Sequence, residues 1–163
     1  MAEGEFARTQ RHLSAGLKIA ADAGAPPQGG HDLYTLLVDT AVLERDADAL
    51  RKYAGLAEQA ARSIDHQLNL GIAHRAWGVA HTLAGEFAEA QSRLEQALQV
   101  FSAYPAPWQV GRTLFELALL AKAAGQKDKA RAHLAKALDA FEGLQAVPDV
   151  RKAREALEAM PAA

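Results

Sequence analysis

The chain repeats itself at a spacing of 40 residues, and this repeat limits its possible folds more than any other feature. Eight residues recur in identity at that spacing: Gly71, Ala84, Gly85, Ala90, Leu94, Ala97, Leu98 and Phe101 return as Gly111, Ala124, Gly125, Ala130, Leu134, Ala137, Leu138 and Phe141. Self-similarity at a fixed period is typical of stacked-repeat proteins, in which each unit buries its apolar face against its neighbours. Such a stack displays a surface and seldom performs chemistry by itself.

Composition excludes several classes of protein. A length of 163 residues, half of them hydrophobic, fits one domain with an ample core, and the absence of cysteine fits a reducing cytoplasm. The net charge of -2 lacks the basic character of a nucleic-acid binder, so direct binding of DNA or RNA is not expected. Residues 1–10 contain no secretory signal, and no apolar run is long enough to span a membrane. We therefore expect a cytoplasmic protein.

Helix-forming residues dominate the chain, with abundant alanine and few β-branched residues, so we expect no sheet. Apolar residues recur at steps of three and four between short breaks rich in glycine, proline or aspartate. This pattern predicts eight helices, at residues 5–23, 31–44, 47–63, 67–84, 87–103, 108–124, 127–142 and 148–160. The short connections indicate that consecutive helices lie antiparallel.

The repeated residues also match a known pattern. His74, Trp77, Gly78, His81, Ala90, Leu94 and Ala97 fall on the spacings W-x2-L-G-x2-Y…A-x3-F, and Leu114, Leu117, Ala118, Ala121, Ala130, Leu134 and Ala137 repeat them. The chain thus resembles tetratricopeptide-repeat proteins, in a form with a period of 40 rather than 34 and with several aromatic positions replaced. Longer units of this kind resemble the repeat regions of bacterial LuxR-type regulators. The resemblance implies an all-α, right-handed α-solenoid of antiparallel helix hairpins, with about eight helices.

The units divide the chain unevenly. We expect a single domain over residues 1–163, with helix-hairpin repeats at 31–64, 67–104 and 108–143 and a capping helix at 148–160. Residues 4–7 match residues 85–88, so the helix within residues 4–24 corresponds to the second half of a hairpin whose first half is missing. We expect this helix to serve as a polar terminal cap. The alternatives are that the chain was cut from something longer, or that another molecule covers the exposed side, as in a homodimer that forms through Phe6, Leu13 and Leu17.

No catalytic constellation is recognisable. The chain has no cysteine nucleophile, no G-x-S-x-G and no HExxH motif, so we expect neither an enzyme nor a cofactor. His74 and His81 share one helix face, but their backbones lie about 10 Å apart along the axis, too far to ligate one metal ion without strong leaning. We expect both histidines to be satisfied within the helix interface and no metal site.

The first helices of successive units are expected to line a concave groove. Superposing units at the 40-residue offset places acidic residues at the N-terminal end of this groove and basic residues around an aromatic ring at its C-terminal end. The candidate groove residues are Asp32, Thr35, Asp39, Arg75, Thr82, Arg112, Phe115, Glu116 and Lys122. Such a channel could receive an extended peptide or helix, with arginine binding a carboxylate. The alternative is an ordinary solvated face.

Two functions are compatible with these features. The first is a non-catalytic module that binds a protein or peptide partner in the groove. On this hypothesis, replacing Arg75 and Arg112 with alanine should weaken binding and leave the melting temperature nearly unchanged. The alternative, which rests on the resemblance to LuxR-type regulators, is a sensor segment of a larger regulator that binds a small effector or an output domain.

Overall fold

The computed structural model describes residues 31–160 without a break and, before them, residues 8, 11–13, 15, 16, 18, 19 and 22. Those nine earlier residues are helical, and Leu13 packs against the core. The continuous part forms seven helices and no strand. The helices are α2 (His31–Glu44), α3 (Ala47–Ser63), α4 (Gln67–Ala84), α5 (Phe87–Ser102), α6 (Pro107–Ala123), α7 (Lys127–Gly143) and α8 (Val147–Glu158).

Local chemistry explains where these helices begin and end. Asp46 caps α3, since its carboxylate accepts hydrogen bonds from the backbone N–H groups of Asp48 and Ala49. Pro107 is the first residue of α6, where a backbone N–H would have no hydrogen-bond partner within the helix, so proline, which lacks this N–H, costs nothing there. Gly85 ends α4 in the left-handed conformation, with φ of 79°, which glycine adopts without a steric penalty.

The 40-residue period is accommodated in the helices. Helices α4 to α7 contain 16 to 18 residues each, and the connections between them are only two to four residues long. In both units the same glycine meets the same ring: a Cβ added to Gly71 would lie 2.8 Å from Phe101, and one added to Gly111 would lie 2.7 Å from Phe141. Residues 40 apart therefore occupy equivalent places in successive layers.

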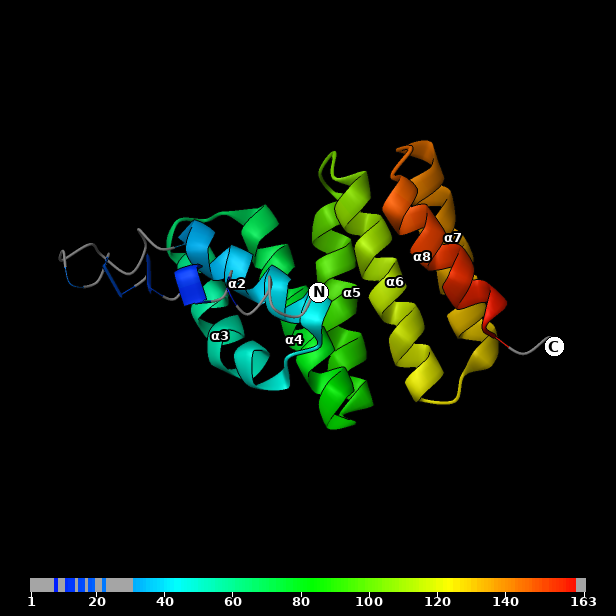
Figure 1. Cartoon of the computed structure of the whole chain (residues 1–163), viewed down its shortest axis with the longest axis horizontal. Coiled ribbons are helices and arrows are strands. Elements are labelled where there is room, and N and C mark those ends of the chain that lie inside the picture. Colours follow the sequence, from blue (N-terminus) through cyan, green and yellow to red (C-terminus); the bar gives the residue numbers. More distant parts are fainter. Residues whose placement is uncertain are drawn as a thin grey trace.

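Successive helices pack as antiparallel hairpins that follow one another along the molecule in sequence order (Figure 1). One core cluster lies among α2, α3 and α4, a second lies among α6, α7 and α8, and α5 contributes to both. The described residues thus form an all-α solenoid of helix hairpins, which confirms the predicted fold class. We call the face formed by α2, α4, α6 and α8 the inner surface, and the face formed by α3, α5 and α7 the outer surface.

The helix positions predicted from the sequence agree with α2 to α8 to within two residues at every end. The predicted first helix, at residues 5–23, is represented by nine helical positions. Phe6 and Leu17, on which the homodimer hypothesis depends, lie outside the described residues. That contact between two copies therefore stays a prediction.

Candidate functional site

Helix α2 crosses the inner surface far enough to contact α6. Arg45, in the turn after α2, donates to the Glu116 carboxylate at 2.7 Å, although the two residues are 71 positions apart. Arg112 of α6 donates to Asp39 of α2 at 3.0 Å. The first unit and the third therefore touch, so the groove is closed by protein along the middle of α2.

Asp39 is the centre of this contact. It accepts hydrogen bonds from Arg75 at 2.9 Å and from Arg112 at 3.0 Å, and Arg75 also donates to the Gln109 side chain at 2.6 Å. Burial alone would raise the pKa of Asp39, but the charges and hydrogen bonds of the two arginines lower it below its usual value. The cluster of Asp39, Arg75, Gln109 and Arg112, which we call the Asp39 cluster, ties α2, α4 and α6 together.

Arg75 differs from its expected role as a groove residue. Its side chain is 0% exposed, so its guanidinium cannot reach a partner without breaking the Asp39 cluster. The expectation that replacing Arg75 leaves the melting temperature unchanged does not fit this burial, since removal of one partner leaves a buried charge unpaired. The repeat pattern placed Arg75 on the side of α4 that contacts α2 and α6, but it did not show that the side chain is fully buried.

An open hollow remains on the inner surface, beyond the Asp39 cluster. It has a volume of about 50 Å³ and opens to solvent. Its walls come from the end of α2, from α6 and α7, and from α8: Val42, Leu43, Arg45, Arg112, Phe115, Glu116, Phe141, Asp149 and Lys152. We call it the inner hollow. It combines apolar side chains with charges of both signs, so it can bury an apolar side chain beside a charged one.

Three side chains of the inner hollow face solvent or a neighbouring ring rather than the core. The Lys152 ammonium lies 4.8 Å from the centre of the Phe115 ring. Leu43 is 52% exposed at the mouth. Asp149 accepts a hydrogen bond from the Trp108 indole at 3.0 Å. Lys152 forms no ion pair within 4.0 Å in the part of the chain that is described, so its charge is open to a partner.

The remaining predicted groove residues are dispersed. Arg112, Phe115 and Glu116 line the inner hollow, although Phe115 and Glu116 are largely buried. Asp32 and Thr35 lie on the first half of α2 and do not line it. The Thr82 hydroxyl donates to the Gly78 carbonyl one turn earlier, and Lys122 is exposed near the end of α6. The structure thus brings together Asp39, Arg75 and Arg112 as one group and Arg112, Phe115 and Glu116 as another.

Sequence reasoning missed Lys152, Leu43 and Arg45. Lys152 follows Arg112 by 40 residues, so extending the predicted rows into the last helix would have found it. Arg45 precedes Gly85 by 40 residues and has a positive φ of 58°, as Gly85 and Gly125 do. No local signal in the sequence shows that the Arg45 side chain reaches Glu116, because that contact depends on the curvature of the whole stack.

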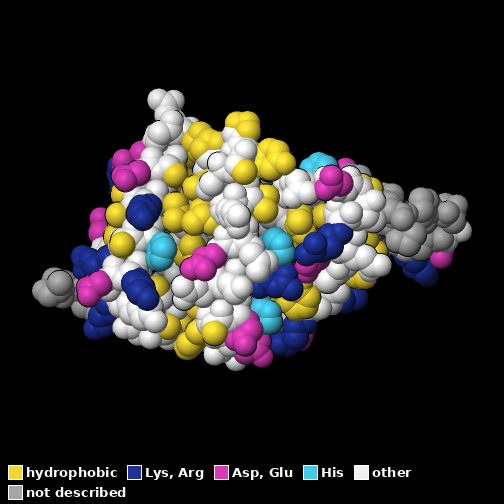
Figure 2. All heavy atoms as spheres, turned by 180° about the vertical axis from the view of Figure 1, so that it is seen from behind, with side chains coloured by type: hydrophobic (Ala, Val, Ile, Leu, Met, Phe, Trp, Pro, Cys, Tyr) yellow, Lys and Arg dark blue, Asp and Glu magenta, His cyan; other side chains and the backbone are white. Residues whose placement is uncertain are grey.

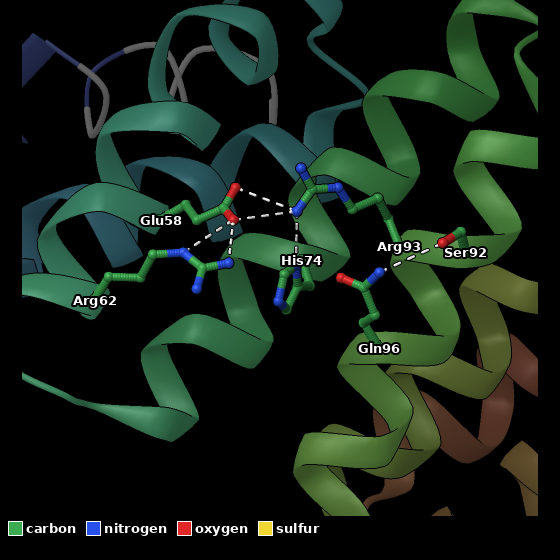
Figure 3. A network of polar contacts seen from close by, with 6 residues as sticks. All are labelled: Glu58, Arg62, His74, Ser92, Arg93 and Gln96. Carbon is green, nitrogen blue, oxygen red and sulfur yellow. Dashed lines mark hydrogen bonds and ion pairs between the residues drawn. The ribbon is translucent and has the colours of Figure 1, made fainter.

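The outer surface has a polar network of its own, between α3 and α5 (Figure 3). The Glu58 carboxylate accepts from Arg62 at 2.8 Å and from Arg93 at 3.2 Å, and Arg93 also lies 2.9 Å from Nδ1 of His74. Burial lowers the pKa of His74, while Glu58 opposes that effect. A neutral His74 whose Nδ1 accepts from Arg93 fits this geometry.

His81 has its partners on the same surface. It pairs with Glu86 and stacks on Trp77, with ring centroids 5.6 Å apart and planes 22° apart. Both histidines are therefore satisfied within the protein, as the sequence predicted. Within the described residues, no three histidine or acidic side chains come close enough to hold a metal ion. None of the helices described is both long and apolar enough to cross a membrane.

Comparisons with known proteins agree with this architecture. Residues 69–143, which contain most of α4 and all of α5, α6 and α7, match the model of the tetratricopeptide repeat family. The crystal structure of BtubC (BKLC) from P. vanneervenii is similar, with a TM-score of 0.67 over 87% of this chain and 19% sequence identity. The chain spans 59% of the length of that protein, and the likeness concerns the fold. No curated protein matches the sequence significantly.

Proposed function

We propose, on the premise that residues 69–143 are tetratricopeptide repeats, that this protein is a non-catalytic module that holds a peptide segment of a partner protein in the inner hollow. Tetratricopeptide repeats generally mediate interactions between proteins. The observation that carries the proposal is the inner hollow itself, where exposed Leu43 and the unpaired Lys152 flank an apolar wall.

The hollow has the parts that recognition of a peptide requires. Leu43 offers apolar contact, and the Lys152 ammonium offers a charge for an acidic side chain. The salt bridge between Arg45 and Glu116 fixes one wall. Because the surrounding helices are already packed, binding would order little of the protein, which favours affinity.

Peptides selected from a random phage-displayed library on the wild-type protein provide the test. Their affinity is then measured by fluorescence polarisation for Leu43→Asp and Lys152→Glu, two exposed positions of the inner hollow. We expect each variant to weaken binding by at least about tenfold. Lys136→Glu, an exposed charge reversal on α7, is the matched control and should bind as the wild type does. Selected peptides that bind all three variants equally, or a library that yields no binder, would contradict the proposal.

A further inference from the structure

A second hollow lies on the outer surface, in the groove between α5 and α7. Its floor is the apolar side of α6, formed by Leu117, Leu120 and Ala121. Its rim is polar and includes Gln91, Glu95, Gln126, Lys129 and His133. It has a volume of about 150 Å³ and opens to solvent, and we call it the outer hollow. Seen from behind the view of Figure 1, hydrophobic side chains are exposed among scattered charged ones (Figure 2).

The preceding groove, between α3 and α5, shows what fills this place one unit earlier. There the Trp77 indole stacks on the His81 ring, and Arg93 lies 5.7 Å from the indole centre. A Cβ added to Gly55 of α3 would lie 3.6 Å from the same indole. Two flat rings thus occupy the space between the helices of the outer surface.

Forty residues later both rings are lost. Leu117 stands at the position of Trp77, and Ala121 stands at the position of His81. Because successive units are in register, these two smaller side chains vacate the places of the rings on α6, while on the facing helix Glu95 replaces the small Gly55. The outer hollow therefore lacks the two rings that α4 supplies in the preceding groove, while the phenyl ring of Phe87 lines it.

The charge of the groove also differs between the two units, at the end where α7 begins. Glu86 is replaced by Gln126 and Glu89 by Lys129 at the 40-residue offset, so two carboxylates are lost and an ammonium is gained. Lys129 is exposed and makes no ion pair within 4.0 Å among the described residues. This end of the outer hollow favours a negative group.

Two more side chains define the rim. Nδ1 of His133, one turn after Lys129 on α7, is buried without a hydrogen-bond partner. Burial and the nearby charges of Lys136 and Lys129 lower the pKa of His133, and Glu95 opposes them. Glu95 is the carboxylate of the rim, and it accepts a hydrogen bond from Gln91 at 2.8 Å. The cation available to a carboxylate ligand is therefore the Lys129 ammonium, while His133 Nδ1 has almost no exposed surface, and the side chains of Gln91, Glu95 and Gln126 complete the polar rim.

We propose that the outer hollow binds a small, flat aromatic carboxylate. Its ring lies over Leu117 and Ala121, where Trp77 and His81 lie in the preceding groove, and its carboxylate pairs with Lys129 beside His133 Nδ1. This site is on the surface opposite to the inner hollow and does not depend on the peptide-binding proposal. It would give the module a small-molecule ligand in addition to its protein partner.

Indole-3-acetate is the probe, with indole and cyclohexylacetate for comparison, and binding is followed by ligand-observed NMR and by amide shifts of the labelled protein. A ligand of this size that fits a preformed site is expected to bind with a Kd of about 1 mM or lower. Indole should bind more weakly, because it lacks the carboxylate, and cyclohexylacetate should bind more weakly, because its ring is not flat. The amide shifts should centre on Ala121 and Lys129.

Three variants make the test specific. Leu117→Trp with Ala121→His restores the two rings of the preceding groove and should reduce the affinity for indole-3-acetate by at least about tenfold. Lys129→Gln should weaken indole-3-acetate to the level of indole and leave indole unchanged. Lys52→Gln, which removes an exposed lysine on α3 outside the lining of the hollow, should bind as the wild type does.

The proposal is overturned if the wild type shows no saturable binding up to about 10 mM, or if the amide shifts centre away from the outer hollow. Binding that survives restoration of the two rings in a folded variant would also overturn it. Should that variant fail to fold, Lys129→Gln and the shift map decide alone. Unchanged affinity for indole-3-acetate in Lys129→Gln would then refute the assigned orientation and the ligand class.

Discussion

Replacing Asp39 with asparagine tests whether the Asp39 cluster holds the inner surface together. Asparagine has nearly the same shape and still offers an oxygen to one arginine, but it removes the negative charge. Arg75, which is 0% exposed, would then be a buried cation whose direct carboxylate partner is gone, with the charge of Glu116 acting on it only from a greater distance. Its bond to Gln109 would remain, so the expected loss is that of charge pairing and not of the whole network.

The size of the effect follows from the burial of the two partners. Breaking a fully buried ion pair by removing one partner costs about 3–5 kcal/mol. The Asp39 side chain is 23% exposed, and the asparagine oxygen retains part of the contact, so water and the amide reduce the loss. We expect the free energy of unfolding to fall by about 2–3 kcal/mol, a large share of the total of about 5–15 kcal/mol. The melting temperature should fall by roughly 5–10 °C.

Urea denaturation followed by circular dichroism, at about pH 7, measures the change. Asp48→Asn is the matched control, since Asp48 also pairs with an arginine, Arg51 at 2.7 Å, but its side chain is 94% exposed. That exposed pair should contribute less than about 1 kcal/mol. If the two variants lost equal stability, burial of the Asp39 cluster could not be the source of its contribution.

The dependence on pH supplies a second refutation. The two arginines lower the pKa of Asp39 in the folded protein below the ordinary 3.8, so its ionisation stabilises the fold fully above the unfolded pKa. The stabilisation from ionised Asp39 disappears as pH falls through the lowered pKa of the folded protein. The Asp39→Asn variant has no carboxylate at this position and therefore no such stabilisation. The difference in stability between wild type and Asp39→Asn should therefore be constant near neutrality and shrink below about pH 4. A difference that grew on acidification would refute the assignment.

Two backbone predictions can be checked by the same urea measurements. Gly111→Ala should lower the free energy of unfolding by about 1 kcal/mol, because the new Cβ would lie 2.7 Å from Phe141 and overpacking outweighs the gain in helix propensity. Gly143→Ala, whose Cβ would meet nothing within 4 Å, should be neutral or stabilising, and equal losses would contradict the close approach. Arg45→Gly and Arg45→Ala both remove the partner of Glu116, so their difference isolates the backbone at φ of 58°. The glycine variant should be more stable than the alanine variant by about 1 kcal/mol. Equal stability of the two variants would show that the fold does not hold residue 45 in the left-handed conformation.

The positions of the helices could be predicted because their causes are local. Turn residues such as Gly85 and helix-starting residues such as Pro107 act within one or two turns of chain, and the apolar period marks which side of each helix is buried. The 40-residue repeat added the register between layers, which Gly71 with Phe101 confirms in the structure. For the candidate site, the sequence indicated only which side of the first helices faces the groove and not which side chains contact one another there.

What the sequence determined by itself is the sequence of hairpins and the side chains that each presents. Only the tertiary structure decided which of those side chains meet. Asp39 and Arg112 are 73 residues apart, and their contact depends on the small rotation between successive units added over the stack. That accumulated curvature buries Arg75, closes the middle of the inner surface and leaves the inner hollow open. The sequence could not predict it, because the rotation between two units depends on the packing of both and no local pattern determines it.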